Sequence, residues 1–88
     1  MEVEYKQQAL EDREYWKKSG NTKIMKRISV LVYDICQHPF TGTGKPEALK
    51  YDLKGLWSRR INDEHRLIYE FVDGKISIIS MRGHYNDK

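Results

Sequence analysis

The stretch GLWSRRINDEHRLIYEFVDGKISIIS, residues 55–80, indicates the fold class of this 88-residue chain. It contains three short runs rich in β-branched and aromatic residues, GLWSRRIN, RLIYEF and KISIIS, and such runs are typical of β-strands. Val72-Asp73-Gly74 separates the last two runs and is a strong β-hairpin signal. We therefore predict consecutive antiparallel strands in this part of the chain.

The N-terminal residues predict a short strand followed by a helix. Val3 and Tyr5 alternate with charged residues, which is the pattern of a short strand. Residues 7–18 contain no Gly or Pro and lead into Ser19-Gly20, a natural helix C-cap. The first helix should therefore end at this pair.

A second, amphipathic helix is predicted next. It starts after Asn21 or Thr22, both of which can cap a helix, and it must stop before Pro39. Its apolar residues recur at intervals of three or four positions: Ile24, Ile28, Leu31 and Ile35. We predict an α+β fold of one domain, residues 1–88, with two N-terminal helices packed on one face of a small, mainly antiparallel β-sheet. The other face of the sheet stays open to a ligand.

Size and composition restrict the function classes. A chain of 88 residues has room for a single core. Residues 1–18 carry charges throughout and no segment resembles a membrane span, so we expect a cytoplasmic protein without a membrane partner. Cys36, the only cysteine, excludes an intrachain disulfide and a Cys-rich zinc site, and we expect it to be buried. The net charge of +3 and the pI of about 9.0 favour an anionic partner.

Arginines in the predicted strand region indicate a phosphate-binding surface. They are Arg59, Arg60, Arg66 and Arg82. Guanidinium groups bind phosphate through a planar fork of donors, and the nearby Tyr85 can stack on a base, so the set suits RNA better than a carboxylate metabolite. The alternative is that these are ordinary surface arginines paired with acids. The acids in question are Asp63, Glu64 and Glu70.

RNA can be cut without a metal ion, because its own 2′-hydroxyl can attack the neighbouring phosphate. The reaction needs a proton acceptor, a proton donor and cations that hold the extra charge. Glu47 is a candidate acceptor, His84 a candidate donor, and Arg66 with Arg60 could stabilise the charge on phosphorus. Glu47 lies in a Gly-Lys-Pro-Glu turn among three lysines, Lys45, Lys50 and Lys54. The residue types alone leave this as one assignment among several.

Two other histidines and two aromatic residues have weaker claims to a site. His38 precedes Pro39 at the predicted helix end, and His65 lies in or beside a turn, so both are interpreted as structural or solvated. Trp57 and Tyr69 have apolar neighbours at strand spacing, which favours packing over base stacking.

Several linked motifs make the chain resemble a known family. They are HPFTGTGKPEALKYDLKGLWSRRINDEHRLIYEF, residues 38–71, and the His84-Tyr85 pair. These motifs resemble the Txe/YoeB family of bacterial toxins, small ribonucleases of the RelE-like superfamily that a cognate antitoxin holds in check. The resemblance is close over residues 38–85 and looser over the helices. One departure is Gly83, where some relatives have a bulkier residue.

The resemblance implies a role for each candidate residue. Glu47 is the general base on the 2′-hydroxyl, and His84 is the general acid toward the 5′-oxygen. Arg66 binds the phosphate in the transition state, and Tyr85 orients or stacks on the substrate. The cations assigned to RNA binding are Lys45, Lys50, Arg59 and Arg60. No metal or other cofactor is expected, because the basic neighbours of Glu47 do not form a carboxylate cluster for Mg²⁺.

The resemblance also implies partners. The family cleaves messenger RNA in the decoding site of the ribosome, so we expect the ribosome and mRNA to bind this chain. We also expect a YefM/Phd-type antitoxin, operator DNA only through the antitoxin complex, and a homodimer. The competing class is a noncatalytic RNA- or protein-binding module that keeps the arginine surface without turnover. The presence of the whole catalytic set argues against that class.

Overall fold

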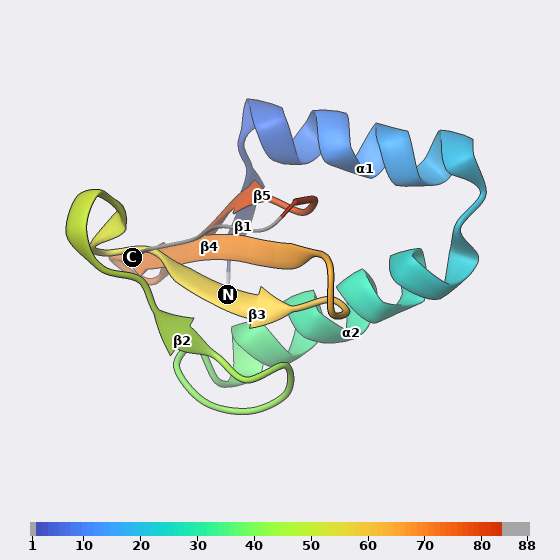
Figure 1. Ribbon diagram of the computed structural model, residues 1–88. Helices are drawn as coiled ribbons and strands as arrows, with labels where there is room; N and C mark the ends of the chain where they lie inside the picture. Colours follow the sequence, from blue (N-terminus) through green and yellow to red (C-terminus); the bar gives the residue numbers. More distant parts are fainter. Residues whose placement is uncertain (1, 84–88) are drawn as a thin grey trace.

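A five-stranded sheet and two helices make up the fold in the computed structural model, which describes residues 2–83 (Figure 1). The helices are α1, Gln7–Ser19, and α2, Thr22–Gln37. The strands are β1 (Glu2–Tyr5), β2 (Glu47–Ala48), β3 (Trp57–Arg60), β4 (Arg66–Val72) and β5 (Lys75–Ser80), with a short 3₁₀ helix, η1 (Tyr51–Leu53), before β3. The strand order is β1-β5-β4-β3-β2, with β1 parallel to β5 and the other neighbours antiparallel. The predicted α+β class with a mainly antiparallel sheet is confirmed.

Both helices cover the same face of the sheet. The core joins Trp16 of α1 and the predicted apolar stripe of α2 to alternate residues of the strands. These strand residues are Leu67, Tyr69, Ile76 and Ile78. Successive residues of a strand point to opposite faces, so Arg66 and Ile68, on either side of Leu67, belong to the face without helices. This second face is called the open face below.

The helices begin and end close to the predicted positions. α1 is followed by Gly20, whose φ of 71° is a left-handed conformation that glycine adopts without steric cost. The side chain of Asn21 accepts a hydrogen bond of 3.1 Å from the N–H of Ile24 and caps α2. No helix within residues 2–83 combines the length and the apolar character that crossing a bilayer requires.

Two local predictions need correction. Cys36 is half-buried rather than buried, because it lies about 100° around the helix from Ile35, which is on the core side of α2. Glu47 does not lie in a turn but forms the two-residue edge strand β2 with Ala48. The packing role predicted for Tyr69 and Trp57 is confirmed, since Tyr69 is fully buried and Trp57 packs against the core.

Candidate active site

The strand register places three of the predicted site residues on the open face. Glu47 of β2 is opposite Ser58 of β3, and Arg60 of β3 is opposite Arg66 of β4. Ser58 and Arg60 are two residues apart on β3, so they point to the same side of the sheet, and their cross-strand partners do too. Glu47, Arg60 and Arg66 therefore share one face, with Glu47 and Arg60 exposed and Arg66 half-buried.

The pKa of Arg66 is shifted by burial and by the charges of its neighbours. Burial is the main cause that lowers the pKa of its guanidinium, and the neighbouring positive charge of Arg60 lowers the pKa further. The carboxylates of Asp63 and Glu47 act in the opposite direction. Like charges directly opposite each other on adjacent strands are destabilising. An anion bound between the two guanidinium groups would remove that repulsion, so this pair is suited to a phosphate group.

Backbone carbonyls orient the Arg66 side chain. Its Nη1 donates to the carbonyl oxygens of Asn62 at 2.7 Å, His65 at 3.1 Å and Asp63 at 3.3 Å. All three acceptors belong to the turn between β3 and β4. The turn therefore holds the guanidinium group through backbone carbonyls, and no carboxylate within residues 2–83 forms an ion pair with it.

The C-terminal part of the described chain meets this site through Arg66. The backbone N–H of Arg66 donates to the carbonyl oxygen of Gly83 at 2.8 Å. His84 follows Gly83 in the sequence. The predicted site residues His84 and Tyr85 lie outside the described residues, so their roles stay predictions.

Lys45 and Lys50 flank Glu47 in the sequence, and both are exposed. Lys45 has a φ of 52°, an unusual conformation for a residue other than glycine. Their predicted role as RNA-binding cations stays a prediction. Within residues 2–83, no group of three or more His, Cys, Asp or Glu side chains is arranged to hold one metal ion.

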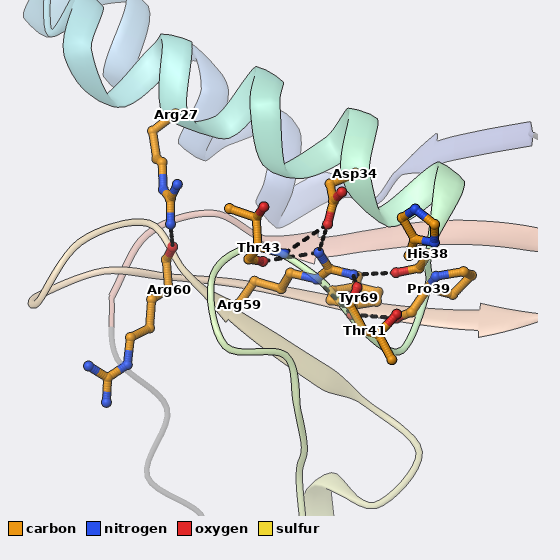
Figure 2. Close-up of polar contacts among 9 residues, drawn as sticks. All are labelled: Arg27, Asp34, His38, Pro39, Thr41, Thr43, Arg59, Arg60 and Tyr69. Atoms are coloured by element: carbon orange, nitrogen blue, oxygen red, sulfur yellow. Dashed lines mark hydrogen bonds and ion pairs between the residues drawn. The ribbon is translucent and has the colours of Figure 1, made fainter.

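The prediction that Arg59 binds RNA is wrong for this structure, because Arg59 points to the helix side and is 0% exposed. Its guanidinium group forms an ion pair with Asp34 of α2 and donates to the carbonyl oxygens of His38, Thr41 and Thr43. Its Nε donates to the hydroxyl of Tyr69 at 3.2 Å. We call these residues the Arg59 cluster. Figure 2 shows the Arg60 side chain pointing away from it.

The Arg59 cluster fixes the loop that leads from α2 to Glu47. The hydroxyl of Tyr69 donates to the carbonyl oxygen of Pro39 at 2.7 Å, and the N–H of Thr43 donates to Asp34 at 2.9 Å. The bond from Thr43, which is the largest cause, and the bond from Arg59 keep the pKa of the Asp34 carboxyl below its ordinary value of 3.8. The loop is therefore tied to both α2 and the sheet shortly before β2 begins.

The loop leaves no space for a side chain at Gly44. Its carbonyl oxygen accepts a hydrogen bond of 2.7 Å from the N–H of Arg60. A Cβ atom at Gly44 would lie 2.8 Å from a Cδ atom of Leu31 and 3.2 Å from the Cβ of Arg59, and the φ of 87° is itself unfavourable for other residues. The Gly-x-Gly-Lys-Pro-Glu motif thus contains the close packing that positions Glu47.

The alternative that the arginines are ordinary surface ion pairs is not what the structure gives for residues 2–83. There, Arg60, Arg66 and Arg82 form no ion pair with Asp63, Glu64 or Glu70. The Arg82 guanidinium instead lies 3.7 Å from the ring centre of Tyr15 on α1. This contact draws Arg82 toward the first helix, so the predicted four-arginine surface reduces to Arg60 and Arg66.

The fold is shared with solved structures of low sequence identity. YafQ from Escherichia coli has the same fold, with a TM-score of 0.71 over 94% of this chain and 92% of its own, although the sequence identity is only 19%. Matches of much higher sequence identity show the family. The model of the "YoeB-like toxin of bacterial type II toxin-antitoxin system" family matches residues 5–85, and this chain belongs to that family.

Individual relatives agree with this assignment. Toxin YoeB from Streptomyces coelicolor is 46% identical over 85 residues, which cover 97% of this chain and 100% of the relative. The YoeB/ParE toxin structure from Agrobacterium tumefaciens has a TM-score of 0.92 at 36% identity, covering 97% of this chain and 100% of its own. A YoeB–YefM complex from Staphylococcus aureus contains a chain with a TM-score of 0.87 at 42% identity, covering 97% and 98%. The Staphylococcus aureus YoeB structure has also been determined as a dimer.

Proposed function

We propose that this toxin is a ribosome-dependent endoribonuclease that cleaves mRNA in the ribosomal A site and so inhibits translation. The observation that supports this most directly is the shared open face of Glu47, Arg60 and Arg66. It combines a carboxylate that can accept a proton with a pair of guanidinium groups suited to one phosphate. A carboxylate metabolite would need the cations but would have no use for the adjacent base.

The proposed reaction is a transfer within the RNA itself. Glu47 takes the proton of the 2′-hydroxyl as its oxygen forms a bond to phosphorus, and Arg66 binds the phosphate as negative charge accumulates there. The bond from phosphorus to the 5′-oxygen breaks, and His84 donates a proton to that oxygen. The products are a 2′,3′-cyclic phosphate and a 5′-hydroxyl. Tyr85 orients the substrate, and Lys45, Lys50 and Arg60 bind RNA.

The partners follow from the charge and from the relatives. The net charge of +3 suits a surface that docks on ribosomal RNA through phosphate contacts, which are sensitive to salt and blind to sequence. The Staphylococcus aureus structures contain YoeB with YefM and YoeB as a dimer. For this chain we propose a YefM/Phd-type antitoxin, a homodimer of the free toxin, and operator DNA contact only through the antitoxin complex.

The test uses purified protein with translating ribosomes and a defined message. Mapping the 3′ ends of the fragments with and without ribosomes shows whether cleavage depends on the ribosome. The upstream fragment should carry a 2′,3′-cyclic phosphate, and cleavage should persist in EDTA when polyamines maintain the ribosome. A 3′-hydroxyl end would contradict the proposed chemistry.

A matched pair of variants tests the proton acceptor. Glu47→Gln keeps the shape of the side chain but removes the base, so cleavage should fall by about 10²–10⁴-fold while ribosome binding persists. Glu14→Gln makes the same chemical change at an exposed position on α1 and should cleave like the wild type. Wild-type protein that binds ribosomes without cutting mRNA would favour the noncatalytic module instead.

A further inference from the structure

The backbone just before His84 is held by hydrogen bonds on two sides. The N–H of Met81 donates to the buried carboxylate of Asp12 at 2.8 Å, and its carbonyl oxygen accepts from the indole N–H of Trp16 at 2.9 Å. Two residues later, the N–H of Gly83 donates to Nδ1 of His65 at 2.9 Å. Together with the bond from Arg66 to the Gly83 carbonyl, these contacts anchor the segment to α1 and to the turn before β4.

His65 is the member of this set whose side chain reaches Gly83. Nδ1 can accept the Gly83 N–H only when this nitrogen carries no proton. The ring packs edge-on against Trp16, with centroids 4.9 Å apart and an interplanar angle of 80°. The side chain is only 14% exposed. The interpretation of His65 as a solvated residue therefore does not apply.

The turn also fixes the His65 backbone. The side-chain oxygen of Asn62 accepts from the N–H of His65 at 2.7 Å, and the N–H of Ile61 donates to the His65 carbonyl at 3.0 Å. The ring is thus oriented from its own backbone and from Trp16. Few alternative positions of Nδ1 are compatible with these contacts.

Gly83 depends on these bonds for its position. Its φ is 91°, a region that glycine enters freely, and among the described residues a Cβ atom built on it would contact nothing within 4 Å. Its N–H and C=O are bound by His65 and Arg66 respectively. His65 and Arg66, which bind Gly83, are consecutive residues, the last of the turn and the first of β4.

We propose that His65 is a positioning residue, which holds the Gly83 peptide through Nδ1 and thereby supports the catalytic step assigned to the next residue in the sequence, His84. This proposal rests on the proposed function, because it assigns His84 the role of general acid. His65 itself exchanges no proton with the substrate. A displacement of about 1 Å in a reacting group can lower a rate by about 10²-fold, so loss of the anchor should be visible in the chemical step.

Two substitutions separate the acceptor from the ring. His65→Phe keeps a ring against Trp16 but has no acceptor, whereas His65→Asn places its amide oxygen near the position of Nδ1. We expect single-turnover cleavage at saturating ribosome concentration to fall by about 10²-fold in His65→Phe. His65→Asn should recover most of that loss, and ribosome affinity should be unchanged in both variants. Wild-type rates in His65→Phe, or equal defects in the two variants, would overturn the proposal.

Hydrogen exchange at the Gly83 amide supplies a readout that does not depend on cleavage. The amide should be protected in the wild type and in His65→Asn, and it should exchange faster in His65→Phe. If the wild type cuts no message, the proposed function fails while the exchange rates still decide whether His65 anchors Gly83. If His65→Phe does not fold, His65→Gln replaces it, because the Gln amide reaches the position of Nε2 rather than Nδ1.

Discussion

Replacing Arg59 by Met should destabilise the fold and leave the open face of the sheet intact. The Arg59 side chain is 0% exposed and donates to Asp34, to Tyr69 and to three loop carbonyls. Met fills a similar space but donates nothing. Removing one partner of a buried ion pair costs about 3–5 kcal/mol. The Asp34 side chain is 23% exposed and can regain some hydration, so we expect the lower end, about 3 kcal/mol.

Thermal and urea unfolding measure this loss, with Arg60→Met as the matched control. A change of 1 kcal/mol shifts Tm by about 4–8 °C in a domain of this size, so Arg59→Met should lower Tm by about 12–24 °C. Arg60 is exposed and faces Arg66, so its removal should change the free energy of unfolding by no more than about 0.5 kcal/mol.

Ribosome affinity should be lower in Arg60→Met than in Arg59→Met, the reverse of the order expected for stability loss. Arg60→Met removes an open-face cation and should bind ribosomes more weakly, whereas Arg59→Met should bind normally at temperatures where it is folded. The reasoning is refuted if Arg59→Met unfolds at the same temperature as Arg60→Met. It is also refuted if folded Arg59→Met loses as much ribosome affinity as Arg60→Met.

Three further changes test the site and its support. Arg66→Lys keeps the charge but loses the guanidinium fork, so single-turnover cleavage should fall by about 10²-fold; an unchanged rate would make Arg66 a docking residue. Gly44→Ala should cost about 1–3 kcal/mol in urea unfolding, more than Gly55→Ala, which is strained by its φ of 100° but meets no atom within 4 Å. Equal costs would show that the contact with Leu31 is unimportant. Because the folded pKa of Asp34 is below 3.8, its stabilisation is present above pH 3.8 and lost as the pH falls through the folded value, so the stability difference between wild type and Asp34→Asn should shrink in that range.

The sequence alone was enough to predict the helices, the three main strands and the family. The apolar residues of α2 repeat with the helical period, and the hairpin between β4 and β5 is marked by Asp73-Gly74. These signals are local, because a residue's period and turn chemistry depend on its neighbours in the chain. Two sequence motifs, Gly-Lys-Pro-Glu and Glu-His-Arg, likewise made Glu47 and Arg66 candidate site residues. The sequence did not show that both lie on the same face of the sheet.

The tertiary structure decided which arginine lies on the open face of the sheet. Arg59 and Arg60 are adjacent and chemically identical, and strand alternation requires only that they point to opposite faces. The choice depends on Asp34, 25 residues away, and on a loop whose carbonyls converge on one buried guanidinium group. The role of His65 was hidden for the same reason, since its partner Gly83 is 18 residues further along the chain. Such long-range hydrogen bonds leave no periodic pattern in the sequence. They form between polar groups that only the packed chain brings together.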